Sequence, residues 1–159
     1  MNRLVSFGIA ASLVASAAVW AAPAKDEAEA KQAIEARSAH FKDMGKAMEP
    51  IGNMLRRKAP YDAAVVEKQS AQIAELAKKI PALYETDTRQ FPNIKTEAVE
   101  GIWASKADFD SKATGLEKAA MELNAKSKGG GSADTFTKDA AAVGKACSSC
   151  HDSYRVKKT

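Results

Sequence analysis

Apolar residues recur at intervals of seven positions in four separate segments of the chain, and lysine and glutamate are frequent between them. The four apolar stripes consist of Ile34, Phe41, Met48 and Leu55, then Val66, Ile73 and Ile80, then Ile102, Phe109, Leu116 and Leu123, and finally Phe136, Val143 and Cys150. A repeat of seven is the spacing with which antiparallel helices pack at about 20°. No segment alternates with the period of two that a half-buried strand requires. The pattern therefore predicts four helices.

Three breaks separate the four predicted helices, at residues 56–62, 81–96 and 128–134. The first two contain prolines and the third contains three consecutive glycines, which interrupt helices. Asp62 is placed to cap the second helix, and one of residues 132–134 to start the fourth. Four helices with short connections predict an all-α protein, an antiparallel up-down four-helix bundle. A long coiled-coil dimer is the alternative, and the breaks disfavour it.

Residues 1–21 have the layout of a cleaved secretory signal peptide. One positive charge at Arg3 precedes an unbroken run of apolar and small residues that is short for a membrane span. The small-residue rule predicts cleavage between Ala21 and Ala22. This cleavage would leave a mature domain of residues 22–159 that is exported to the periplasm. An uncleaved amino-terminal anchor is the alternative.

The charge pattern narrows the class of partner. Removing residues 1–21 takes out one basic and no acidic residue, so the mature chain keeps 23 basic against 20 acidic residues, a net charge of +3. These charges are interspersed, and only the short sequence RVKK resembles the dense basic stripe of a nucleic-acid-binding protein. No second apolar run is long enough to span a bilayer. We expect one exported domain with no nucleic-acid partner and no membrane span in the mature chain.

The chain contains only two cysteines, Cys147 and Cys150, and His151 directly follows the second one. Both cysteines fall on the inward face of the predicted fourth helix. His151 lies four residues after Cys147, about one helical turn, and therefore projects to nearly the same side. The sequence CSSCH thus places two thiols and one imidazole toward the interior of the bundle.

Four kinds of chemistry use two cysteines at this spacing. A disulfide within one helix fits bridge geometry poorly, and a thioredoxin-like redox pair would need a βαβ context. A zinc site would need a fourth ligand, and the only other histidine is His40. Attachment of a c-type haem suits the motif, because two thiols add to two vinyl groups while the adjacent imidazole binds the iron. The sequence therefore predicts one haem c held by Cys147, Cys150 and His151.

The motif lies near the end of the chain, and residues 152–159 contain neither methionine nor histidine. The opposite face of the iron must therefore meet an upstream helix. The first helix offers Phe41, Met44 and Met48 on its apolar face. Phe41 over the iron would leave it five-coordinate, whereas a thioether from one of the methionines would make it six-coordinate. His40 lies beside the apolar face and is expected at the surface.

Arg37 is a charged residue at an apolar-stripe position of the first helix. A buried charge is costly unless it is paired, and a haem propionate is a carboxylate that suits the planar guanidinium. We therefore predict a contact between Arg37 and a propionate. The alternative is that Arg37 extends outward with its aliphatic stem on the core.

With these features the chain resembles cytochrome c′. The likeness rests on Arg37 four residues before Phe41, on APYDAA and IWASKADF at the starts of the second and third helices, and on VGKACSSCHDSYRVKK at the end. The resemblance implies that His151 is the proximal ligand, with Arg155 as a basic residue beside it and Arg37 near a propionate. It places Phe41 at the distal position, where members of this family carry leucine or a ligating methionine. It also implies a homodimer formed through the first two helices.

The expected function is that of a periplasmic electron-transfer protein that binds small gases, above all nitric oxide and also carbon monoxide, at an apolar distal face. The sequence leaves its redox partner unidentified. A six-coordinate electron carrier with a methionine ligand is the rival. A small peroxidase-like enzyme is a third possibility, but the first helix offers no acid–base residue other than His40 over the iron. No catalytic residue is therefore assigned.

Overall fold

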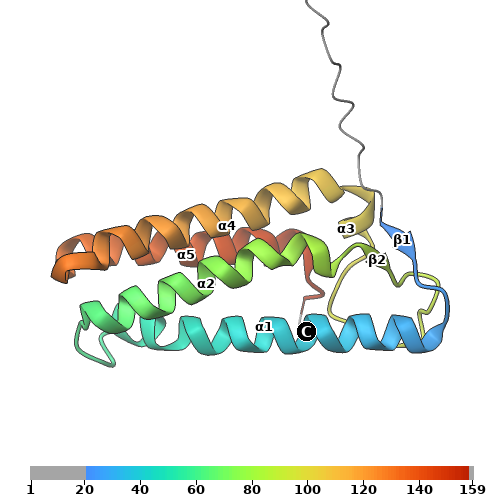
Figure 1. The fold of residues 1–159 in the computed structure, drawn as a ribbon, viewed down its shortest axis with the longest axis horizontal. Helices are drawn as coiled ribbons and strands as arrows, with labels where there is room; N and C mark the ends of the chain where they lie inside the picture. Colours follow the sequence, from blue (N-terminus) through green and yellow to red (C-terminus); the bar gives the residue numbers. More distant parts are fainter. Residues whose placement is uncertain (1–20, 158–159) are drawn as a thin grey trace, which may run out of the picture.

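The computed structural model describes residues 21–157, so that the predicted signal peptide lies outside the described residues except for Ala21. The long helices are α1 (Glu27–Leu55), α2 (Ala63–Leu83), α4 (Lys106–Ser127) and α5 (Ala133–Tyr154). They run alternately up and down the long axis of the molecule, as predicted (Figure 1). The shorter elements are strands β1 (Ala22–Pro23) and β2 (Thr86–Asp87), helix α3 (Gly101–Ala104) and the 3-10 turn η1 (Lys128–Gly130).

Short polar side chains cap three of the long helices at their amino-terminal ends. An oxygen of Asp62 accepts a hydrogen bond from the backbone N–H of Val65 at 3.1 Å, which confirms the predicted start of α2. Ser132 accepts one from Thr135 in the same way and so starts α5 after the glycines. Each cap satisfies a backbone donor that has no partner within the helix.

The helices depart from the predicted breaks at two places. Pro81 does not end α2 but lies in its last turn, where the loss of one backbone donor costs little because the ladder ends at Leu83. The predicted third helix is divided at Ser105, whose backbone leaves the helical region. The division turns α3 so that the indole N–H of Trp103 donates to the carbonyl of Tyr84 at 3.2 Å.

The predicted apolar stripes form the core, but the helices do not pack tightly against one another everywhere. Fully buried side chains come from all four long helices and from α3, and include Ile51, Ile73, Ile102, Phe109 and Val143. Helix α2 packs on α1 and α4, and α4 packs on α5, whereas α1 and α5 touch each other at few places. Stripe residues that face this last gap, such as Phe41 and Cys150, remain only partly buried.

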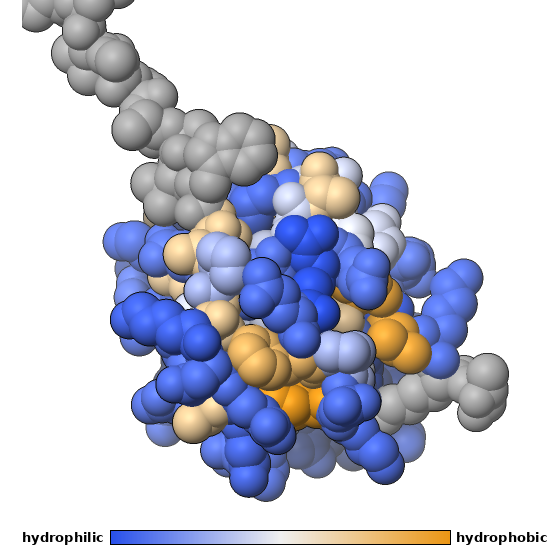
Figure 2. Space-filling view, turned by 90° about the vertical axis from the view of Figure 1, so that its right-hand side faces the viewer, coloured by the Kyte–Doolittle hydropathy of each residue, from blue (hydrophilic) through white to orange (hydrophobic). Residues whose placement is uncertain are grey.

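A two-stranded parallel pairing that the sequence pattern did not indicate joins the beginning of the described chain to the segment after α2. The backbone N–H of Ala22 donates to Glu85 O at 2.7 Å, and that of Ala24 donates to Asp87 O at 2.8 Å. The pairing lies at the end of the bundle where α1 begins (Figure 1). Seen from this end, the surface is mostly hydrophilic and has a small group of hydrophobic residues in its lower middle part (Figure 2).

Gly131 provides a test of the turn between α4 and α5. Its φ is +38°, and an added Cβ would lie 2.9 Å from the carbonyl oxygen of Lys126 and 2.6 Å from the hydroxyl of Tyr61. We expect Gly131→Ala to lower the free energy of unfolding by about 1–3 kcal/mol, measured by chemical denaturation.

Gly115 is the matched control, because it lies inside α4 and an added Cβ would meet no atom within 4 Å. We expect Gly115→Ala to stabilise the protein by about 0.5–1 kcal/mol. Equal stability of Gly131→Ala and the unmodified protein would show that the turn tolerates a side chain.

Candidate functional site

A large cavity of about 840 Å³ lies between α1 and α5. Part of α4 closes it on one side, and residues 95–98 of the segment before α3 contribute to its wall. Most of the surface that lines the cavity is apolar. Its volume is within the range of about 300–1,000 Å³ typical of cofactor and small-molecule sites. The cavity occupies the gap that the helix packing leaves open.

Cys147, Cys150 and His151 all line this cavity from α5. Both cysteines are half-buried and neither is in a disulfide. Burial raises the pKa of both thiols, so that they are protonated at neutral pH. Burial, and then the positive charge of Arg155, lower the pKa of His151. A neutral imidazole keeps a nitrogen lone pair available to a metal.

The opposite wall of the cavity belongs to α1. Phe41, Met44 and Met48 all line it, so that the predicted distal residue and both candidate thioethers lie in the same cavity. Met44 is buried, while Phe41 and Met48 are partly buried. These three side chains form an apolar part of the wall, where water and ions are disfavoured.

His40 does not line the cavity, although it is adjacent to Phe41 in the sequence. Its Nε2 lies 2.9 Å from the carbonyl oxygen of Leu76 in α2, to which it donates. Burial is the main cause that lowers the pKa of His40, which favours the neutral ring at pH 7. The imidazole is partly exposed and also joins the α1–α2 contact.

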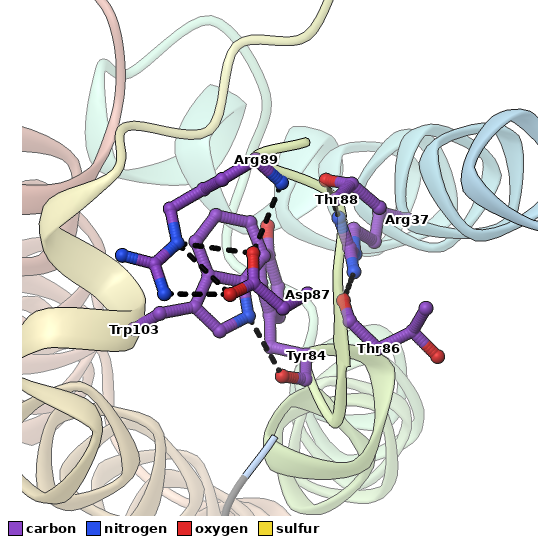
Figure 3. A network of polar contacts seen from close by, with 7 residues as sticks. All are labelled: Arg37, Tyr84, Thr86, Asp87, Thr88, Arg89 and Trp103. Carbon is purple, nitrogen blue, oxygen red and sulfur yellow. Dashed lines mark hydrogen bonds and ion pairs between the residues drawn. The ribbon is translucent and has the colours of Figure 1, made fainter. Parts of the chain in front are cut away.

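Arg37 is buried, with 3% of its surface exposed, and it also lines the cavity. Its guanidinium donates to Leu83 O at 2.8 Å, to Thr88 Oγ1 at 3.1 Å and to Thr86 O. Leu83 is the last residue of α2, and Thr86 and Thr88 lie in the segment that follows it (Figure 3). Two carbonyls and a hydroxyl thus accept hydrogen bonds from the buried cation, and the nearby charge of Asp87 also favours it. The predicted propionate contact stays a prediction.

Aromatic rings complete the surroundings of Arg37. The guanidinium carbon lies 4.5 Å from the ring centroid of Tyr84 and 5.4 Å from that of Trp103, which are cation–π distances. Asp87 forms an ion pair with Arg89, whose guanidinium also approaches Trp103 at 5.7 Å (Figure 3). No role was predicted for Tyr84 or Trp103, because the only signal in the sequence was a tyrosine and a tryptophan beside an irregular segment.

A second aromatic group supports the α5 side of the cavity. Phe109 packs between Tyr84 and Tyr154 with ring centroids 4.7 and 5.3 Å away. Tyr154 lies three residues after His151, and its hydroxyl donates to a carboxylate oxygen of Asp108 at 2.6 Å. This hydrogen bond is the main cause that raises the pKa of Tyr154 to about 12. The bond links α4 to the end of α5 that carries the motif.

Arg155 follows the last helical residue and lines the cavity beside His151. Its guanidinium forms an ion pair with Glu97 at 2.7 Å. Glu97 was not predicted, because its position before α3 lies in a segment without regular periodicity. The structure therefore brings all the predicted site residues to one cavity: Arg37, Phe41, Met44, Cys147, Cys150, His151 and Arg155.

Two further findings bear on the chemistry. Within residues 21–157, no group of three or more His, Cys, Asp or Glu side chains is arranged to hold a metal ion. In the same range, no helix is both long and apolar enough to cross a membrane. Two unpaired thiols, a neutral imidazole and a large apolar cavity fit a covalently attached haem.

Comparison with known proteins decides the family. The family model described as cytochrome C' matches residues 32–155, most of the chain. This chain belongs to the cytochrome c′ family. It is therefore a c-type haem protein, and its cofactor is covalently attached haem c.

Relatives match over most of their own length. The chain is 38% identical to cytochrome c' of Rhodopseudomonas palustris over 79% of this chain and 83% of that protein. It is 31% identical to cytochrome c-554 of Cereibacter sphaeroides over 99% of both chains. The solved structure of cytochrome c' from R. palustris superposes with a TM-score of 0.72 at 36% identity and covers 80% of this chain and 98% of that one.

The two cysteines can be tested directly. We expect Cys147→Ser with Cys150→Ser to abolish covalent haem, because no other cysteine exists in the chain. Mass spectrometry and a haem stain on a denaturing gel measure the attachment. Ser149→Ala, an exposed change between them, should retain it. Covalent haem in the double variant would contradict the assignment.

Proposed function

We propose that this chain is an exported, periplasmic cytochrome c′ that binds nitric oxide and carbon monoxide at a five-coordinate haem and exchanges electrons with a redox partner. Residues 1–21 would be removed as a signal peptide and residues 22–159 would form the mature domain. The family, the signal-like sequence and the cavity geometry support the proposal. The bound haem supplies an iron that cycles between two oxidation states and takes a gas as ligand.

Cys147 and Cys150 would form the two thioether bonds. Each S–H adds across a vinyl C=C bond, with sulfur on one carbon and the proton on the other, so that the attachment needs no oxidant. His151 would bind the iron through one ring nitrogen, which its neutral state at pH 7 leaves available. Arg37 and Arg155 would stabilise the charges of this assembly, Arg37 from the α1 side and Arg155 next to the imidazole.

The observation that carries the five-coordinate proposal is the composition of the α1 wall. Phe41 cannot bind iron, and the nearby His40 donates to Leu76 O instead of facing the cavity. The apolar part of this wall, formed by Phe41, Met44 and Met48, favours small neutral molecules over water and anions. The part of the cavity that α1 lines therefore contains no imidazole, which supports binding and electron transfer rather than peroxidase-like turnover.

A six-coordinate electron carrier is the second candidate function. Met44 and Met48 both line the cavity, so either thioether has access to it. Their place on the apolar face of α1 equally suits core packing, where methionine fills irregular space. We favour the five-coordinate site because Phe41 takes the position that the resemblance assigns to the distal residue.

The proposal includes two protein partners. One is a second copy of this chain, in a homodimer formed through α1 and α2 as the family resemblance implies. The other is an unidentified redox partner. A nucleic-acid partner forms no part of the proposal, because the mature chain has a net charge of only +3.

Phe41 is the residue that tests the distal site. We expect Phe41→Ala to make carbon monoxide bind the ferrous protein roughly ten- to a hundredfold more tightly, because it removes steric strain of about 1–3 kcal/mol. Stopped-flow and equilibrium titration with carbon monoxide and nitric oxide measure the effect.

Lys42→Ala is the control, since Lys42 lines the same cavity but is exposed. Its affinity for carbon monoxide should stay close to that of the unmodified protein. Unchanged binding of both gases by Phe41→Ala would rule out Phe41 as the distal gate.

A further inference from the structure

We infer that Glu97 is a positioning residue for the proximal side of the site: it holds Arg155 next to His151 and offsets the positive charge that the imidazole faces. The inference rests on the proposed role of His151 as the iron ligand. Glu97 comes from the irregular segment before α3, and nothing in the helical pattern of the sequence points to it.

The ion pair is closely defined. Nε of Arg155 donates to Oε2 of Glu97 at 2.7 Å, and Nη2 lies at the same distance from the same oxygen. Arg155 lies four residues after His151, and its backbone N–H donates to His151 O at 3.2 Å. All three residues line the cavity. The carboxylate therefore fixes the direction of a guanidinium that is one helical turn from the proposed ligand.

Backbone pairing supports this arrangement independently of the side chains. The N–H of Val156 donates to Glu97 O at 2.8 Å, and the N–H of Val99 donates to Tyr154 O at 3.3 Å. Ala98 and Arg155 form an antiparallel bridge. The segment before α3 thus stays attached to the end of α5 when the Glu97 side chain alone is changed.

Charges from two elements face His151. Asp152 belongs to the last turn of α5, Arg155 directly follows that helix, and Glu97 belongs to the segment before α3. Arg155 contributes positive charge, and the two carboxylates oppose it. Removing the carboxylate of Glu97 would leave the imidazole and the iron in a more positive field, which favours the ferrous over the ferric state.

The ion pair is too exposed to act mainly as a stability device. The side chains of Arg155 and Glu97 keep 37% and 59% of their surface exposed, and exposed ion pairs contribute little to folding. A role in positioning therefore predicts an electrochemical change without a change in thermal stability. A purely structural role predicts a lower thermal stability without a change in the reduction potential.

Spectroelectrochemical titration of the holoprotein tests the inference. We expect Glu97→Gln to raise the reduction potential, so that the ferrous-to-ferric ratio at a fixed applied potential increases several-fold. A tenfold increase in this ratio corresponds to about 59 mV for one electron. Arg155→Gln should lower it, and the double variant should return toward the unmodified protein. Glu97→Asp, which keeps the charge, should restore most of the potential, and Glu97→Gln should leave the melting temperature unchanged.

Glu100→Gln is the matched control, because it removes the same charge from the same segment at an exposed residue that does not line the cavity. A potential shift in Glu97→Gln no larger than in Glu100→Gln would overturn the inference, as would a shift accompanied by a lower melting temperature that Glu97→Asp fails to rescue.

The iron–histidine stretching band of the ferrous protein separates this inference from the proposed function. Absence of the band in the unmodified protein would reject the five-coordinate state, while the potential comparison still decides the role of Glu97. If the band is present but Glu97→Gln shifts the reduction potential no more than Glu100→Gln does, the inference is rejected and the proposed function stands.

Discussion

Incomplete packing between α1 and α5 is the constraint on which the site depends. The bundle is held by the contacts of α2 with α1 and α4 and of α4 with α5, so that α1 and α5 can stay apart. Phe41 and the two cysteines face this gap and are only partly buried. Burial of apolar surface is the main favourable contribution to folding, so an apolar occupant stabilises such a gap. In a cytochrome c′, covalent haem c is that occupant, and the cofactor completes the core.

The irregular segment between α2 and α3 is tied to the bundle on both sides of the cavity. Arg37 donates to Thr86 O and Thr88 Oγ1 near its beginning, and β1 pairs with the same stretch. The end of α5 binds its later part through Glu97. A segment without periodicity therefore has a defined path past the haem cavity, because buried cations and backbone donors require fixed partners.

Local rules in the sequence were sufficient for the four-helix pattern and for the haem motif, but not for the division of the third helix at Ser105. The period of seven predicted the bundle, because it decides which side chains helices bury, and Asp62 predicted a start because its cap is local. The spacing of Cys147, Cys150 and His151 reflects covalent chemistry, so it could be recognised without a fold.

Partners distant in the sequence could not be predicted in this way. The guanidinium of Arg37 contacts groups 46 to 51 residues away, at the end of α2 and on a segment whose path no periodicity describes. The need for a partner was foreseen, but the carbonyls and aromatic rings that supply it were not. The pairing of Glu97 with Arg155, 58 residues apart, was hidden for the same reason.

The optical absorption spectrum of the purified holoprotein, recorded oxidised and reduced, tests the central claim most directly. With His151 as the only protein ligand and Phe41 on the opposite face, the spectrum should be that of a five-coordinate, high-spin haem in the reduced state. A low-spin spectrum of the methionine-ligated type in both oxidation states would contradict the account and would assign the second ligand to Met44 or Met48.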